Sequence, residues 1–182
     1  YQSALSDAQV MQLYQASVAP TNAIPDTSPV TVAAGATLDL NGFSETIGPL
    51  DGGGQVATNG GGLWINSTGD ADFAGTVSGT GSVVKLNAAR QTLSGANTYT
   101  GSTSVIQGEL DLGAAGAVGS ATSLTDVGTT DGVSATLSIG GGSLDASSIT
   151  VGSDGSGTLN VNGTAMVNAR GNTGFGALVV GL

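Results

Sequence analysis

Residues 79–112 read GTGSVVKLNAARQTLSGANTYTGSTSVIQGELDL, and they carry the clearest structural signal in the chain. Short runs of alternating apolar and polar residues are separated by glycines, and Val83, Lys85, Gln91 and Leu93 share one parity within them. Residues of one parity lie on one face of a strand. Runs this short and this close together favour a coil in which each strand pairs with the equivalent strand of the next turn.

The same residues resemble the autotransporter-associated β-strand repeat, which occurs in passenger segments of bacterial surface and secreted proteins. The family pattern runs roughly G-x-L-x-K-x-G-x-G-T-L-x-L-S-G-x-N-T-Y-T-G-x-T-x-V-x-x-G-x-L-x-L. The positions that follow it in register are Val83, Lys85, 93–95, 97–101, Val105, Gly108, Leu110 and Leu112. Departures occur at the first corner, where Asn87, Ala89 and Gln91 replace the usual Gly, Gly and Leu. The resemblance implies a right-handed parallel β-helix carried outside the cell.

A second internal repeat lies near the C-terminus. Residues 136–139 (TLSI) match residues 158–161 (TLNV) at a shift of 22 residues. A period of this size is typical of a solenoid with three short strands in each turn. We therefore expect about six coils over residues 30–182.

The same repeat predicts how the last coils align. Leu144 should match Met166 at the shift of 22, and Val151 should match Val180 at a shift of 29. The longer shift implies about seven extra residues near 168–176. Insertions of this kind map to a corner of a solenoid, where they disturb few contacts.

Residues 1–19 differ from the rest of the chain. Ser6 can cap a helix, and Val10 and Leu13 then follow at helical spacing. Residues 4–14 (ALSDAQVMQLY) also resemble the closing segment of LamG-type, concanavalin-like domains. The short helix is either the tail of such an upstream domain or a cap over the first coil, since an open coil end is an unpaired edge.

Residues 20–29 (PTNAIPDTSP) are a proline-rich linker by composition, and the strand-like runs begin at Val30. The chain opens without a basic, apolar-cored leader, and we expect it to be an interior fragment of a longer protein. The expected fold is all-β: a right-handed parallel β-helix, or β-solenoid, over residues 30–182, preceded by a short N-terminal helix.

Composition restricts the partners. The 32 glycines and the charged fraction of 9% could indicate disorder, but recurring apolar runs between the glycines favour a narrow solenoid core. The net charge of −10 opposes binding to nucleic acid or to an anionic bilayer. No run approaches the roughly 20 apolar residues of a membrane helix. We expect no nucleic-acid partner and no membrane insertion of this segment.

Catalytic chemistry has few candidates. The chain has no His and no Cys, and its one lysine, Lys85, is already part of the repeat pattern. Ser–His and thiolate mechanisms therefore lack their essential groups. Asp70 and Asp72 share a strand face, but the sequence shows no basic partner for lyase chemistry beside them. We expect no enzyme, no catalytic residue and no cofactor.

Calcium is the metal to consider in an acidic, glycine-rich chain. Asp70 with Asp72, and Asp126 with Asp131, are the candidate carboxylate pairs. Residues 151–157 approach the repeat word of calcium-loaded β-rolls once, without its nonapeptide period. Carboxylates that solvate a corner are the favoured interpretation, and we expect no metal site.

Trp64 is the candidate ligand contact. It lies between Leu63 and Ile65, so alternation sends its side chain to the face opposite theirs. If those two residues are interior, Trp64 is exposed and could stack on a sugar. Alternatively, it packs under a corner or against the N-terminal helix.

The leading functional hypothesis is a non-enzymatic structural or adhesive segment of a bacterial surface or secreted autotransporter-like protein, acting as a β-helical stalk or passenger. The alternatives are a carbohydrate-binding module that uses exposed aromatics, and a self-assembling extracellular fibre subunit. Expected partners are a glycan, a host or cell-surface ligand, or further copies joined end to end.

Overall fold

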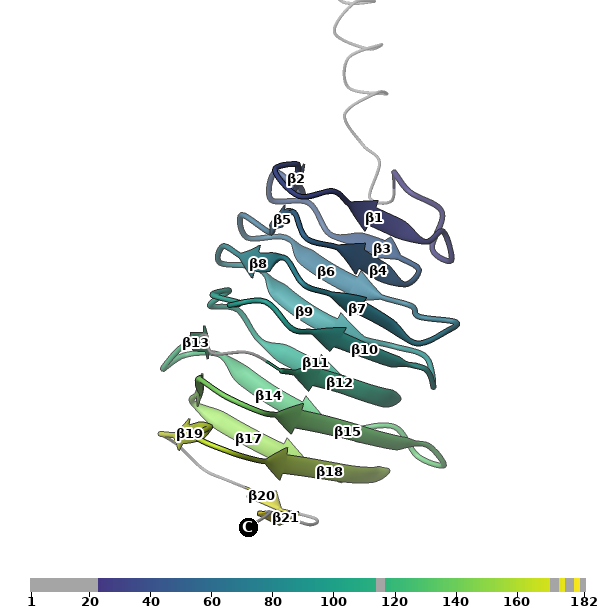
Figure 1. Cartoon of the computed structure of the whole chain (residues 1–182). Helices are drawn as coiled ribbons and strands as arrows, with labels where there is room; N and C mark the ends of the chain where they lie inside the picture. The colour runs from purple at the N-terminus through teal and green to yellow at the C-terminus, as the bar shows by residue number, and fades with distance from the viewer. Residues whose placement is uncertain (1–22, 114–116, 171–173, 176–178, 181–182) are drawn as a thin grey trace, which may run out of the picture.

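The computed structural model describes residues 23–113 and 117–170, together with the backbone of 174–175 and 179–180. Every regular element within these residues is a β-strand. The strands wind in a right-handed sense from the N-terminal to the C-terminal end, and successive coils pair in parallel (Figure 1). The helix expected within residues 1–19, and residues 20–22 of the linker, lie outside the described residues.

Each coil contributes one strand to a front sheet and one to a back sheet, as seen in Figure 1. The front sheet has eight strands: β1 (Val30–Val32), β4 (Leu50–Gly52), β7 (Ala71–Phe73), β10 (Arg90–Leu93), β12 (Gly108–Leu112), β15 (Ser134–Ile139), β18 (Ser156–Val161) and β21 (Val179–Val180). The back sheet has seven: β3 (Glu45–Ile47), β6 (Gly62–Ile65), β9 (Ser82–Lys85), β11 (Thr103–Val105), β14 (Leu124–Val127), β17 (Ser148–Val151) and β20 (Gly174–Phe175).

Two short sheets close the third side of the coil. One contains β2 (Thr37–Asp39), β5 (Gln55–Ala57) and β8 (Thr76–Ser78), and the other contains β13 (Ala117–Gly119), β16 (Ser143–Ala146) and β19 (Met166–Ala169). Between them, residues 97–100 of the fourth coil form no strand but keep the ladder. Thr98 N donates to Val77 O at 2.8 Å, and Gly119 N donates to Tyr99 O at 2.9 Å.

The described strands belong to seven coils, with the front strand of an eighth, against the roughly six coils expected. The count is higher because most coils are short. Leu63 pairs with Val83 and Val83 with Thr103, two steps of 20 residues. The parallel, all-β solenoid that the repeat words predict is confirmed.

The alignment of the last coils is partly corrected. Residues 136–139 pair with 158–161 at the predicted shift of 22. Leu144, however, pairs with Val167 and not with Met166, because the corner before β19 has one residue more than the corner before β16. The predicted match of Val151 with Val180 is also wrong. Val151 pairs with Phe175 in the back sheet, whereas Val180 pairs in the front sheet.

Aliphatic side chains stack in columns inside the coil. The inward column of the back sheet is fully buried and in register: Ile47, Ile65, Lys85, Val105, Val127 and Val151. Each buried aliphatic side chain contributes roughly 1.5–3 kcal/mol, so the columns are the main source of stability. The parity predicted for residues 83–93 is confirmed, because Val83, Lys85, Gln91 and Leu93 are all fully buried.

Two corners are built on stacked glycines. A Cβ atom on Gly95 would lie 1.8 Å from the Gly75 carbonyl oxygen in the coil above, and one on Gly75 would lie 2.0 Å from Gly54 O. At the next corner, a Cβ on Gly81 would lie 1.6 Å from Gly61 O, and one on Gly101 would lie 2.2 Å from Gly81 O. The glycines of the repeat pattern are therefore positions where backbones of successive coils meet.

Candidate functional site

Trp64 lies on the outer face of the back sheet. Its neighbours Leu63 and Ile65 are fully buried, whereas Trp64 is 42% exposed, as the alternation of β6 predicts. The indole leans over Gly62, where a Cβ atom would lie 2.7 Å from Trp64 Nε1. Glycine at position 62 therefore leaves the space in which the ring lies against the strand.

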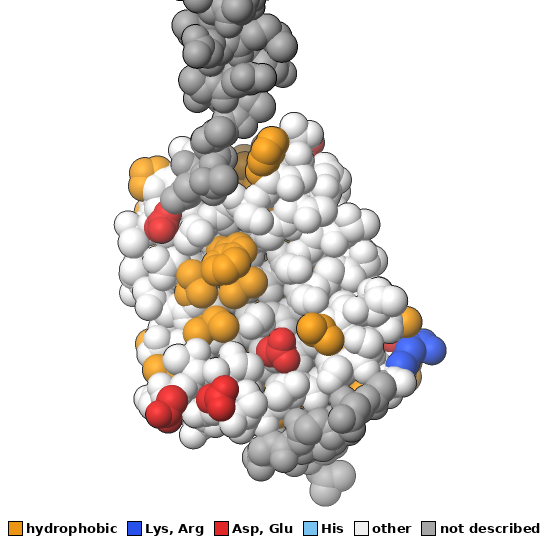
Figure 2. All heavy atoms as spheres, turned by 180° about the vertical axis from the view of Figure 1, so that it is seen from behind, with side chains coloured by type: hydrophobic (Ala, Val, Ile, Leu, Met, Phe, Trp, Pro, Cys, Tyr) orange, Lys and Arg blue, Asp and Glu red, His pale blue; other side chains and the backbone are white. Residues whose placement is uncertain are grey.

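Three further apolar side chains lie near Trp64 on the same outer face. Val84 is its direct partner in the next coil. Leu86 follows on the same face, and Ile106 lies below Leu86 in the register set by Lys85 and Val105. All three are half-buried. Together with Trp64 they form the Trp64 patch. Figure 2, which views the molecule from this side, shows hydrophobic side chains gathered near the centre of the face.

Hydroxyl groups flank the Trp64 patch. Thr46 pairs with Trp64 from the coil above, and Ser104 pairs with Val84 from the coil below. Neither hydroxyl forms a hydrogen bond within the described part of the chain. In the adjacent column, by contrast, Ser44 Oγ accepts from Gly62 N at 3.0 Å and Ser82 Oγ accepts from Ser102 N at 3.2 Å.

This part of the back sheet is uncharged. The outward positions of β3, β6, β9 and β11 are Thr46, Gly62, Trp64, Ser82, Val84 and Ser104. The first acidic residue on this face is Asp126, two coils below Val84. In a chain with a net charge of −10, four successive back-sheet strands without an outward charge are a distinctive surface.

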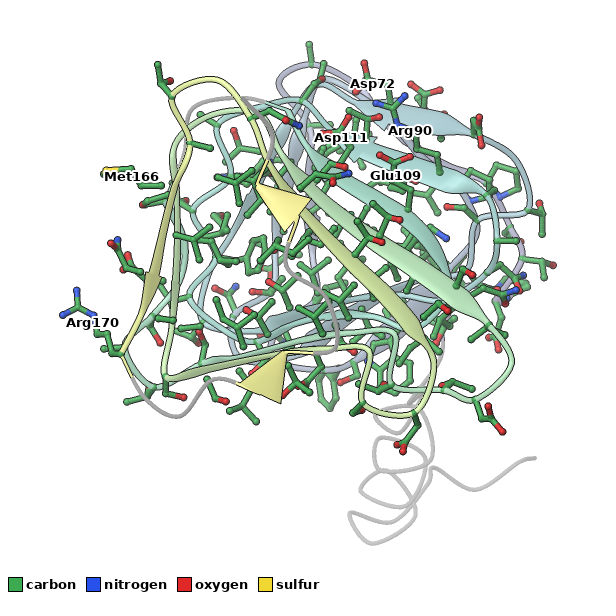
Figure 3. All side chains as sticks on the ribbon, turned by 90° about the horizontal axis from the view of Figure 1, so that it is seen from below. Asp72, Arg90, Glu109, Asp111, Met166 and Arg170 are labelled. Carbon is green, nitrogen blue, oxygen red and sulfur yellow. The ribbon has the colours of Figure 1, made fainter. Side chains whose placement is uncertain are left out.

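The front sheet carries the opposite kind of surface. Parallel stacking places Asp70 beside the backbone of Arg90 in the next coil, and Asp72 beside Thr92. Arg90 N donates to Asp70 Oδ1 at 2.8 Å, and the guanidinium forms an ion pair with Asp111. Figure 3 shows Arg90 with Asp72, Glu109 and Asp111 on this face. Hydrogen bonding to Asp111 raises the pKa of Arg90.

These charges have structural uses. Asp72 Oδ1 accepts from Ser94 Oγ at 2.7 Å, which links two coils. Exposed ion pairs such as those of Arg90 contribute about 0–1 kcal/mol each. Asp126 faces outward from β14, whereas Asp131 is exposed in the turn that follows. Across the described ranges, no group of three or more acidic side chains is placed to hold a metal ion.

Three buried polar side chains were not assigned a role from the sequence. Lys85 occupies an aliphatic column, and its Nζ donates to Asn87 O. Burial lowers the pKa of Lys85 to about 8. Glu45 accepts hydrogen bonds from the backbone amides of Ala23 at 2.8 Å and Ile24 at 2.5 Å. This anchors the linker beside a hollow of about 220 Å³ at the N-terminal end of the solenoid.

Gln91 is the third of these residues, and it is one of the departures from the repeat pattern. Strand alternation places it inward, but its polar role depends on a break between β4 and β7, which pair only at Gly52 and Phe73. That break is visible only in the three-dimensional structure, so no local pattern in the sequence indicates it.

The described residues also contain no helix long and apolar enough to cross a membrane.

Comparisons with known proteins agree with the repeat. Residues 83–112 match the family described as the passenger-associated-transport-repeat. An 86-residue stretch is 38% identical to the protein named "Adhesin BmaC autotransporter" from Brucella suis biovar 1 (strain 1330), covering 43% of this chain and 2% of that protein. The chain thus spans a small fraction of this relative. No solved structure matched it. The LamG-like resemblance of residues 4–14 lies outside the described residues and stays a prediction.

Proposed function

We propose that the chain is a rigid β-helical segment of a bacterial autotransporter-like passenger, which holds adhesive surfaces away from the cell. One observation carries the proposal: the passenger repeat at residues 83–112 coincides with the solenoid geometry. It begins in β9 and ends with β12, so it contains one full coil with a flanking strand at each end.

The location follows from the same match. Passenger repeats are parts of exported proteins, and the segment lies outside the bacterial cell, on the surface or in the medium. The matched relative is named an adhesin, which supports an adhesive role for the protein that contains this chain. The segment itself supplies length and stiffness through the stacking of neighbouring coils.

We assign the segment no catalytic role. The chain has no His and no Cys, and the side chain of Lys85 is fully buried in the core. A buried lysine that donates to Asn87 O is held away from any substrate. The acidic groups around Arg90 are engaged in contacts between coils.

The test uses the intact native protein on its own cells. Antibodies against this segment should label unpermeabilised cells; labelling only after permeabilisation would contradict the proposed location. Removal of residues 134–155 deletes one coil in phase, because Ser134 and Ser156 are register partners. Secretion and adhesion should survive this deletion. Removal of residues 134–144 shifts the phase and should abolish both.

Equal loss of secretion in both deletion variants would overturn the stalk proposal. Sedimentation velocity of the 182-residue chain gives an independent measurement. An elongated monomer at all concentrations agrees with a stalk, whereas growth into polymers would favour the fibre-subunit alternative.

A further inference from the structure

We propose that the Trp64 patch is a binding platform for a neutral glycan, with the apolar face of a pyranose ring stacked on the indole of Trp64. This inference deepens the adhesive part of the function proposed above and rests on it.

The indole of Trp64 lies in a space left by Gly62, and within the described part of the chain its Nε1–H is free to donate a hydrogen bond. Gly62 leaves the ring room to lie along the strand, and any side chain at that position would push Nε1 away. Trp64 Nε1 has no hydrogen-bond partner within the described residues. Tryptophan combines a large apolar face with one polar N–H, a combination that suits a ligand with an apolar face and polar edges.

The patch has the size of a small ligand. A tryptophan side chain can bury roughly 150–250 Å², so Trp64 at 42% exposure offers on the order of 100 Å². Val84, Leu86 and Ile106 are half-buried and add less each. A standard protein interface buries about 800 Å² on each partner, which this patch cannot supply. One or two sugar rings fit it better than a second copy of the chain.

Hydroxyl groups lie where ring substituents would reach. Thr46 is one coil from Trp64 and Ser104 is two coils away on the other side, at the coil spacing of about 4.8 Å. Both hydroxyls are outward and form no hydrogen bond within the described residues. They can donate to or accept from sugar hydroxyls without breaking an existing bond.

The charge pattern selects a neutral glycan. No outward position of β3, β6, β9 or β11 is charged, so the platform has no basic group to pair with a sialic acid or sulfate. The net charge of −10 on the chain repels such anionic ligands further. A cationic ligand would instead be expected on the front sheet, beside Asp72 and Glu109.

The experiment exploits the fact that Trp64 is the one tryptophan of the chain. The 182-residue protein is screened on an array of neutral, sialylated and sulfated oligosaccharides, and maltotetraose, cellotetraose and chitotetraose are titrated in solution. Tryptophan fluorescence excited at a wavelength that spares tyrosine reports contact directly. We expect at least one neutral glycan to bind and to change this emission saturably.

Matched variants separate stacking from folding. Trp64→Ala should weaken glycan binding at least tenfold while the protein keeps a cooperative urea transition, because the side chain is outside the core. Phe43→Ala, which removes the other exposed aromatic side chain among the described residues (46% exposed), should change binding less than twofold. Gly62→Val keeps the indole but fills the space in which the ring lies, so it should displace the ring and also weaken binding at least tenfold.

Several outcomes would overturn the inference: no neutral glycan bound, binding only of anionic glycans, binding unchanged in Trp64→Ala, or Trp64-dependent dimers in sedimentation. None of these results changes surface labelling or the behaviour of the coil deletion. The failure of this inference is therefore distinguishable from the failure of the proposed stalk.

Discussion

The side-chain amide of Gln91 pairs with the backbone of Leu50, a residue 41 positions earlier and two coils away. Leu50 N donates to Gln91 Oε1 at 3.1 Å, and Gln91 Nε2 donates to Leu50 O at 2.8 Å. The intervening coil presents Ala71 at this level, and β4 and β7 pair only at Gly52 and Phe73. Inside the core, the glutamine amide thus supplies the hydrogen bonds to Leu50 that the backbone of β7 does not form.

Replacement of Gln91 by leucine, the usual residue of the repeat, tests this role. Gln91→Leu should lower the free energy of unfolding by about 1–3 kcal/mol, since it leaves the buried N–H and C=O of Leu50 unpaired. Gln55→Leu is the matched control at an exposed glutamine and should stay within about 0.5 kcal/mol. Urea unfolding followed by circular dichroism provides both values. A Gln91→Leu protein as stable as the parent would refute the bridging role.

Asn97 joins the third and fourth coils through its amide. Its Oδ1 accepts from Val77 N at 2.9 Å, while Nδ2 donates to Leu93 O at 3.0 Å and to Gly95 O at 2.9 Å. Asn97→Ala leaves Val77 N buried without an acceptor, and we expect a loss of about 1–3 kcal/mol. Asn87→Ala, at an exposed asparagine, should be nearly neutral in the same denaturation series. Equal effects of the two would show that the corner does not need the amide.

The glycine stacks predict a strong contrast between two alanine substitutions. Gly95→Ala forces a Cβ onto the Gly75 carbonyl and should cost at least about 3 kcal/mol, beyond ordinary overpacking. Gly69→Ala meets nothing within 4 Å and should be neutral or stabilising by up to about 1 kcal/mol. Thermal unfolding midpoints would reveal the difference. Tolerance of Gly95→Ala would mean that successive coils are not in backbone contact there.

Because Lys85 is buried, we predict an unusual dependence of the free energy of unfolding on pH. Burial lowers its pKa from 10.5 to about 8 in the folded state. Between pH 8 and about 10 the unfolded chain therefore binds more protons, and stability should rise with pH. The full gain is at most about 3 kcal/mol for a shift of this size. Lys85→Met should be more stable than the parent at pH 7 and should lose the rise.

Tyr99 sets the upper limit of the pH range in which stability rises. Its hydroxyl is fully buried beside Thr103, and burial raises the pKa of Tyr99 to about 12 from an ordinary value of 10.0. Above pH 10 the unfolded chain loses this proton first, so stability should fall again. Tyr99→Phe should reduce the fall while leaving the rise caused by Lys85. A parent protein with a flat profile from pH 8 to 10 would contradict the assignment to Lys85.

The sequence predicts the repeating parts of this molecule well, because their rules are local. Alternation places Val83 and Leu93 on one face, and it places Trp64 on the face opposite Leu63 and Ile65. The shift of 22 residues between 136–139 and 158–161 is also correct, since both runs occupy the same sheet. Corner lengths are harder to predict. One extra residue before β19 moves the partner of Leu144 from Met166 to Val167.

The remaining features depend on residues that are distant in sequence. The pairing of Gln91 with Leu50 requires a gap in the ladder, and the meeting of Arg90 with Asp70 requires the register of two coils. Val151 and Val180 look alike as short apolar runs next to glycine, yet they belong to different sheets. Local pattern identifies a strand, but it does not identify the side of the coil on which the strand lies.

The parallel ladders also determine how the segment would respond to mechanical tension. Adjacent coils are joined by hydrogen bonds that run along the solenoid axis, so pulling on the two ends opens one coil after another. A coil of 20 residues, such as the step from Leu63 to Val83, spans only about 4.8 Å along the axis when folded. The same 20 residues reach about 70 Å when they are fully extended. Under tension from fluid flow, the segment of a tethered cell would therefore lengthen in steps, one coil at a time, and each step would limit the force on the tether before the next coil unwinds.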